Sequence, residues 1–143
     1  MVSAVSTATR LISVEIDPER AAACRSLFAD CGNVEILQGD WRQIVPHGPF
    51  DLAVLDGGGG GKRDGDLPAD PTELLVVGGT VILDDMHPAL EQWPPARQPA
   101  EDTHGRNVNR ARDYWFNHPD MLTTEFRIHP IAGAIVATRR GTV

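Results

Sequence analysis

Acidic side chains stand where the β-rich runs of this sequence end. In chain order they are Glu15, Asp17, Asp40, Asp56, Asp84 and Asp85. Ligands of open parallel sheets bind beyond the carboxyl ends of the strands, so these residues are the first candidates for chemistry. Carboxylates that converge on one edge repel one another unless a cation or hydrogen-bond donors offset their charge. The pattern therefore indicates a metal or a polyhydroxylated ligand, with helix capping or turn formation as the alternative for any single aspartate.

Three of these acids form a candidate metal site. Asp56 closes one β-rich run, and Asp84 with Asp85 closes the next, so they offer hard oxygen ligands suited to Mg²⁺ or a similar divalent cation. Histidine and cysteine are absent from these three positions, which disfavours a structural zinc site. His87 is the one nearby residue that could soften the ligand set.

Glu15 is the candidate for holding a nucleotide cofactor. An acid at the end of a strand that opens a β-α-β unit commonly accepts hydrogen bonds from the ribose hydroxyls. Asp17 fits better as a helix N-cap, because it immediately precedes Pro18.

The glycine run at residues 57–61, which Lys62 follows, does not match a phosphate-binding P-loop. Asp56 stands where the first glycine of that motif is needed, and Arg63 replaces its serine or threonine. No G-x-G-x-x-G motif stands between a strand and a helix either. We interpret the run as a flexible turn.

The elements that position these residues follow from the hydrophobic pattern. Short β-rich runs predict strands over residues 11–16, 34–37, 50–55 and 80–83. A helix is expected from Asp17 to Gly32, and a short crossover helix over residues 73–77. Strands that alternate with helices predict an α/β fold with a mostly parallel sheet.

The last third of the chain has a different pattern. Residues 88–107 hold four prolines and little periodicity, which indicates a long surface loop that could serve as a lid. A short helix is expected over residues 108–117. Two further β-rich runs, over residues 123–128 and 131–138, flank a tight turn and predict an antiparallel hairpin.

Composition limits the classes of protein and partner. The 143 residues include 13 basic and 20 acidic ones, a formal charge of −7, and 41% are hydrophobic. These values are typical of one soluble domain over residues 1–143, and the acidic balance argues against nucleic acid and membranes as partners. Two cysteines, the lack of a basic leader and the lack of a long apolar run predict a cytoplasmic protein.

Four segments carry a resemblance to a known family. They are LISVEIDPERAAACRSLF, VEILQGDW, FDLAVLDGGGGGK and GGTVILDDMHP. In this order and spacing, over residues 10–138, they resemble the class I S-adenosylmethionine-dependent methyltransferases, specifically the metal-dependent O-methyltransferases related to catechol O-methyltransferase. The resemblance implies a Rossmann-like, mostly parallel sheet flanked by helices and closed by the antiparallel hairpin.

The resemblance also implies roles for residues at the strand ends. In the family, the acid that ends the second strand holds the ribose of S-adenosylmethionine, and this acid falls on Glu15. Asp40 and Trp41 fall where residues frame the adenine, although Trp41 could equally belong to the core. The family's metal ligands map onto Asp56, Asp84 and Asp85. We count Asp56 among the cofactor-binding residues as well.

The implied reaction is methyl transfer from S-adenosylmethionine to the hydroxyl oxygen of a small molecule. A bound divalent metal would lower the pKa of that hydroxyl, and Lys62 or His87 would take its proton. A solvated surface position is the alternative for Lys62. The expected partner is the small-molecule substrate, with a homodimer left open as an assembly.

The sequence departs from the family near its amino-terminal end. The family begins with a central strand and a glycine-rich turn of the E-x-G-x-G-x-G kind, and the ten residues before Leu11 supply neither. We therefore expect an N-terminally truncated, partial domain in which residues 2–5, direct strand pairing or another chain fills the gap. Two other functions stay open. One is a noncatalytic methyltransferase-like domain or partner subunit, and the other is a nicotinamide dehydrogenase, although the only tyrosine, Tyr114, has no lysine after it.

Overall fold

The computed structural model describes residues 8–62, 66–86, 108–129 and 132–141. The chain divides into two compact units, Met1–His47 and Gly48–Val143, and each is described by itself. The predicted loop over residues 88–107 and the candidate strand over residues 2–5 lie outside the described residues.

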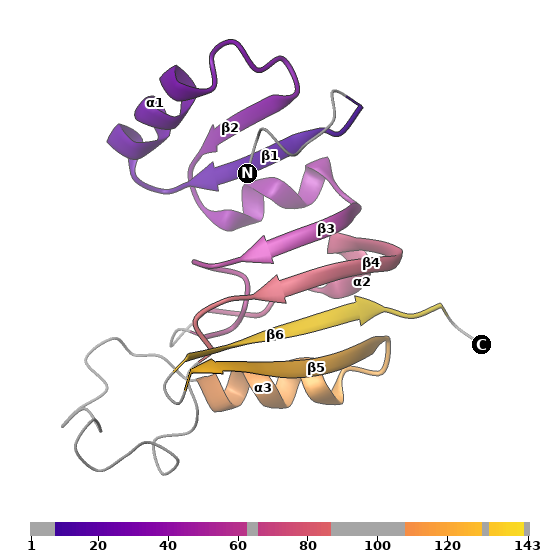
Figure 1. Cartoon of the computed structure of the whole chain (residues 1–143). Helices are drawn as coiled ribbons and strands as arrows, with labels where there is room; N and C mark the ends of the chain where they lie inside the picture. The colour runs from indigo at the N-terminus through magenta and orange to yellow at the C-terminus, as the bar shows by residue number, and fades with distance from the viewer. Residues whose placement is uncertain (1–7, 63–65, 87–107, 130–131, 142–143) are drawn as a thin grey trace, which may run out of the picture. The chain divides into compact units, whose positions relative to one another are not determined.

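The first unit is a β-α-β arrangement followed by a short 3-10 helix. Its elements are β1 (Leu11–Glu15), α1 (Pro18–Leu27), β2 (Val34–Gln38) and η2 (Trp41–His47). β1 and β2 pair in parallel, from Leu11 opposite Val34 to Glu15 opposite Gln38 (Figure 1). Both strands and the helix between them confirm the sequence prediction, with small differences at the ends.

Helix α1 begins where the sequence predicts. The Oδ1 atom of Asp17 accepts hydrogen bonds from the amides of Glu19 and Arg20, both at 2.9 Å, and Pro18 occupies the first turn. The helix ends earlier than expected, at Leu27 instead of near Gly32. A hydrogen-bonded turn between residues 28 and 34 replaces the expected last helical turn.

The second unit is a four-stranded mixed sheet with two helices. Its elements are β3 (Phe50–Leu55), α2 (Pro71–Leu74), β4 (Leu75–Leu83), α3 (Val108–Asn117), β5 (Met121–His129) and β6 (Ala132–Arg139). The strand order is β3-β4-β6-β5. β3 and β4 are parallel, whereas β6 runs antiparallel to both β4 and β5 (Figure 1). The predicted parallel pair and the predicted closing hairpin are both present.

The crossover helix predicted over residues 73–77 is wrong in its second half. Helix α2 ends at Leu74, and Leu75 already belongs to β4. A bulge accounts for the longer strand: Phe50 pairs with Leu75, but Leu52 pairs with Thr80. Gly78, with φ of 83°, makes this bulge without strain.

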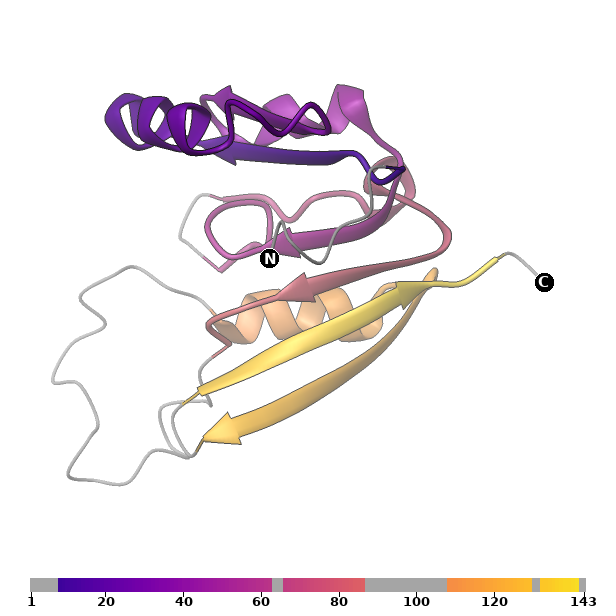
Figure 2. The same cartoon turned by 45° about the horizontal axis from the view of Figure 1, so that its top comes forward.

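One face of the second unit's sheet forms the core. Helix α3 lies against this face (Figures 1 and 2), where Val81, Leu83, Trp115 and Ile135 are fully buried. The opposite face retains exposed apolar side chains, including Val54 with 54% of its surface exposed. Among the described residues, no helix is long and apolar enough to cross a membrane.

Candidate functional site

The carboxyl ends of β3 and β4 bring two of the predicted acids to one edge of the second unit. The strands are parallel and Leu55 pairs with Leu83, so the next residues, Asp56 and Asp84, leave the sheet at the same edge. Both residues are exposed. This arrangement agrees with the position that the sequence pattern predicts for them.

The backbone directly after Asp84 has an unusual conformation. Asp85 has φ of 54°, a region that residues other than glycine rarely adopt. Its amide donates to Oδ1 of Asp84 at 2.8 Å, and the amide of the buried Met86 donates to the carbonyl of Gly133 at 2.8 Å. Neighbouring hydrogen bonds thus hold Asp85 in a strained geometry, which is a feature that concentrates at functional sites.

Lys62 lies beneath these strand ends. Its side chain is buried, and its Nζ donates to the carbonyl of Asp56 at 2.8 Å and to the carbonyl of Asp84 at 2.6 Å. The solvated surface position is therefore excluded. The sequence predicts Lys62 as a proton acceptor but does not anticipate that its ammonium group joins two strands.

The glycine run before Lys62 is held by specific hydrogen bonds. Gly59 accepts the amide of Ala69 at 2.7 Å through its carbonyl, and its own amide donates to Asp66 at 3.0 Å. The carbonyl of Gly60 accepts the indole N–H of Trp115 at 3.1 Å. The interpretation of this run as a flexible turn is therefore wrong, because helix α3 and residues 66–69 fix its path.

The predicted metal ligands fit a divalent cation in their chemistry, but among the described residues they do not gather around one point. Asp56, Asp84 and Asp85 supply hard oxygen atoms, which fit Mg²⁺ in kind. Within the described ranges, however, no three His, Cys, Asp or Glu side chains gather closely enough to hold an ion. His87 lies outside these ranges. These residues therefore have the type of side chain that a cation site needs, but the described residues do not form a complete site.

In the first unit, Glu15 and Asp40 lie at the carboxyl ends of β1 and β2. The amide of Gly39 donates to the carbonyl of Glu15 at 2.9 Å, so the two strand ends are joined. The Oε1 atom of the half-buried Glu15 accepts the amide of Asp17 at 2.9 Å. This hydrogen bond orients the carboxylate, while Asp17 caps α1 as predicted.

Arg42 determines the electrostatics around Asp40 and Trp41. Its backbone N–H and its guanidinium donate to Oδ1 of Asp40, at 3.0 and 2.9 Å, and lower the pKa of that carboxyl. The same guanidinium lies 4.8 Å from the centroid of the Trp41 ring, which is half-buried. Trp41 is therefore not a buried core residue of this unit.

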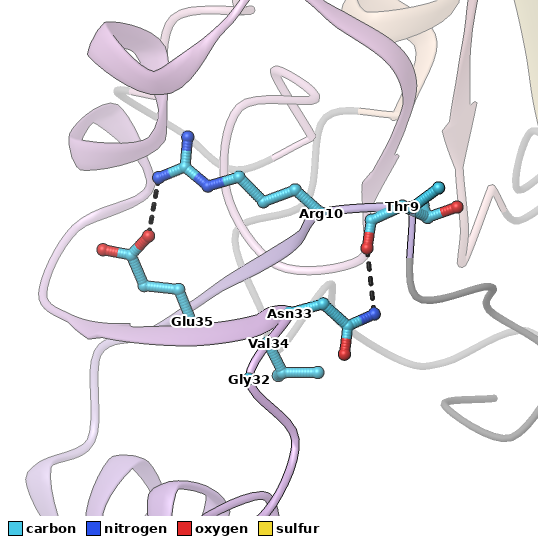
Figure 3. Close-up of a pocket in the computed structure, with 7 residues that line it drawn as sticks. Thr9, Arg10, Gly32, Asn33, Val34 and Glu35 are labelled. Carbon is cyan, nitrogen blue, oxygen red and sulfur yellow. Dashed lines mark hydrogen bonds and ion pairs between the residues drawn. The ribbon is translucent and has the colours of Figure 1, made fainter.

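A shallow pocket of about 270 Å³ lies at the other end of the first unit's strands. Figure 3 shows Arg10 paired with Glu35 at 2.7 Å, and the side-chain amide of Asn33 donating to the carbonyl of Thr9 at 2.9 Å. These residues are at the amino ends of β1 and β2, whereas ligands of parallel sheets bind beyond the carboxyl ends. We therefore do not assign the functional site to this pocket.

No model of a known protein family matches this sequence, and no curated protein matches it. Solved structures do match. The O-methyltransferase TomG from Streptomyces achromogenes, which is involved in tomaymycin synthesis and was solved with S-adenosylmethionine (SAM), aligns with a TM-score of 0.70 at 21% identity. The alignment covers 97% of this chain and 66% of TomG.

Two further structures give the same result. The O-methyltransferase from Bacillus cereus, solved with SAH, has a TM-score of 0.67 at 17% identity over 92% of this chain and 63% of its own. The Podospora anserina methyltransferase PaMTH1, also bound to SAH, has a TM-score of 0.66 at 17% identity, over 92% and 61%. The chain thus has the fold of these methyltransferases and spans about two thirds of their length.

Proposed function

We propose that this chain catalyses methyl transfer from S-adenosylmethionine to the hydroxyl oxygen of a small molecule. The observation that carries the proposal is its fold, which matches TomG, an O-methyltransferase solved with SAM, over 97% of the chain. Acidic residues at the carboxyl ends of the strands, where this class of sheet binds ligands, support it further.

The first unit supplies the groups proposed to hold the nucleoside part of the cofactor. Glu15 would accept the ribose hydroxyls, and the amide of Asp17 already orients its carboxylate. Asp40 and Trp41 would border the adenine. Arg42 lowers the pKa of Asp40, and the Asp40 carboxylate, which is ionised at neutral pH, can accept hydrogen bonds there.

The second unit supplies the groups proposed to bind the acceptor. Asp56, Asp84 and Asp85 are our candidates for a divalent cation, and Asp56 also borders the cofactor in this proposal. When bound, such an ion would lower the pKa of the acceptor's hydroxyl. His87 stays our predicted acceptor of the hydroxyl proton, and it lies outside the described residues.

The proposed reaction is a single displacement at the methyl carbon. The acceptor's oxygen forms a bond to the methyl carbon while the carbon-sulfur bond breaks, giving a methyl ether and S-adenosylhomocysteine. The proton of the hydroxyl passes to the base. Holding both reactants in line would make the transfer effectively unimolecular, which lowers its barrier.

A noncatalytic methyltransferase-like domain or partner subunit is the second candidate function, because the likeness to the solved methyltransferases, at 17–21% identity, concerns the fold alone. Such a domain would keep the fold without binding the cofactor by itself.

Isothermal titration calorimetry with S-adenosylmethionine, with and without Mg²⁺, separates the two candidates. We expect saturable binding that Glu15→Gln weakens at least tenfold, because the neutral amide is a poorer acceptor for two hydroxyls. Glu35→Gln is the matched control, since Glu35 belongs to the same unit but pairs with Arg10 at the amino ends of the strands. No heat at millimolar ligand would favour the noncatalytic alternative.

A further inference from the structure

Lys62 is the only lysine in the chain, and the other twelve basic residues are arginines. Only 4% of its surface is exposed. The single ammonium group of the side chains therefore lies inside the second unit. A buried charge is unfavourable unless its surroundings provide hydrogen-bond partners, so its position requires an explanation.

This ammonium donates hydrogen bonds to two main-chain carbonyls. Nζ lies 2.8 Å from the carbonyl oxygen of Asp56 and 2.6 Å from that of Asp84. Each carbonyl belongs to the first residue after a strand, β3 in one case and β4 in the other. A compact ammonium with rotatable donors can join two such carbonyls.

The glycine run is shaped to bring Lys62 into this position. Gly59 and Gly61 have φ of 81° and 75°, which favours glycine at both places. A Cβ atom on Gly60 would lie 3.1 Å from Leu83 and 3.6 Å from the Lys62 side chain, so the backbone passes close to both. The run therefore reverses the direction of the chain, so that Lys62 returns to hydrogen-bond distance of Asp56, the residue that precedes the run.

We propose that Lys62 is a positioning residue for the methyl-transfer site, an inference that rests on the proposed function. Its ammonium fixes the main chain at Asp56 and Asp84, so that both carboxylates leave the sheet edge at a set spacing. Its positive charge also reduces the repulsion between these carboxylates. We assign it no proton-transfer step.

Hydrogen exchange and cofactor binding test this role in the full chain. Lys62→Met keeps the length of the stem and removes the ammonium. We expect faster amide exchange at residues 57–62 and 84–86, unchanged exchange in the β5-β6 hairpin, and at least tenfold weaker binding of S-adenosylmethionine. Arg127→Met is the matched control, because it removes an exposed cation from β5 in the same unit. It should leave both measurements unchanged.

Restoring the charge separates positioning from simple packing. Lys62→Cys, in a background with Cys24 and Cys31 replaced by alanine, can be alkylated with 2-bromoethylamine while unfolded and then refolded. The product carries an ammonium at nearly the length of lysine, and we expect it to recover both the exchange protection and the binding. Alkylation with iodoacetamide gives a neutral side chain and should recover neither.

Each outcome decides the proposal. If Lys62→Met keeps wild-type exchange at both strand ends, or binds S-adenosylmethionine as tightly as wild type, Lys62 does not position the site. If wild type itself does not bind S-adenosylmethionine, the proposed function fails, and the exchange arm alone decides whether Lys62 fixes the strand ends. Should Lys62→Met not fold, Lys62→Gln, which removes the charge but keeps a neutral amide donor group, replaces it in every measurement.

Discussion

The indole N–H of Trp115, on helix α3, donates to the carbonyl of Gly60 at 3.1 Å, 55 residues earlier in the chain. Trp115 and Gly60 are both buried, so this hydrogen bond satisfies polar groups in the interior of the unit. This hydrogen bond therefore links helix α3 to the glycine run, two segments that lie far apart in the sequence.

Trp115→Phe tests this coupling. The phenyl ring keeps most of the packing but leaves the Gly60 carbonyl without the indole donor. We expect the free energy of unfolding, measured with urea, to fall by about 1–3 kcal/mol. Phe116→Leu, on the exposed side of the same helix, should change it by less than about 0.5 kcal/mol. Equal effects of the two substitutions would contradict the coupling.

Two alanine substitutions test whether the glycine run has a required path. Gly61 has a positive φ, and a Cβ atom there would lie 2.7 Å from Cγ of Pro68. We expect Gly61→Ala to lower the free energy of unfolding by about 1–3 kcal/mol. Gly57→Ala, which has no atom within 4 Å of the new Cβ, should stay within about 0.5 kcal/mol of wild type. A freely flexible run would tolerate both changes alike.

Asp70 predicts a pH dependence of stability. The side-chain hydroxyl of Thr72 donates to its carboxylate at 2.7 Å and lowers the pKa of Asp70, as does the backbone amide of the same residue. Since the folded pKa is lower than the unfolded one, this stabilisation is complete above about pH 4 and is lost as the pH falls through the folded pKa.

Urea unfolding of wild type and Asp70→Asn between pH 2 and 7 measures this effect. Asparagine keeps an oxygen that can cap α2 but has no charge to titrate. We expect the variant to be less stable at pH 7 and the difference to shrink as the pH falls. A difference that is constant with pH would show that the carboxylate's ionisation makes no contribution.

Local sequence signals predict most elements of the two units. The Asp17-Pro18 start of α1, the apolar run of β3 and the hairpin of β5 and β6 all depend on residues near one another in the chain. The structure confirms each of them, because capping and alternation act over a few residues. The positions of the acids after β3 and β4 could also be predicted, because these acids come directly after the two strands in the sequence.

Long-range contacts account for what the sequence does not predict. Residues 75–77 extend β4 because pairing with Phe50 and a bulge at Gly78 compete with helix formation. The burial of Lys62 depends on carbonyls from two strands, and the fixed glycine run depends on Trp115. A single lysine among thirteen basic residues was the one available signal, and its rarity alone does not indicate a location.

The burial of the only lysine gives the folded chain an intrinsic reporter of local opening. A protease specific for lysine has one peptide bond to cut in this chain. Because Lys62 is buried, the protease can bind it only after the glycine run has opened locally away from the rest of the unit. Under conditions where reclosing is faster than cutting, the rate of cleavage measures the population of the opened form. A ligand that engages Asp56 or Asp84 would then slow digestion in proportion to its occupancy, which provides a binding assay that needs no known acceptor.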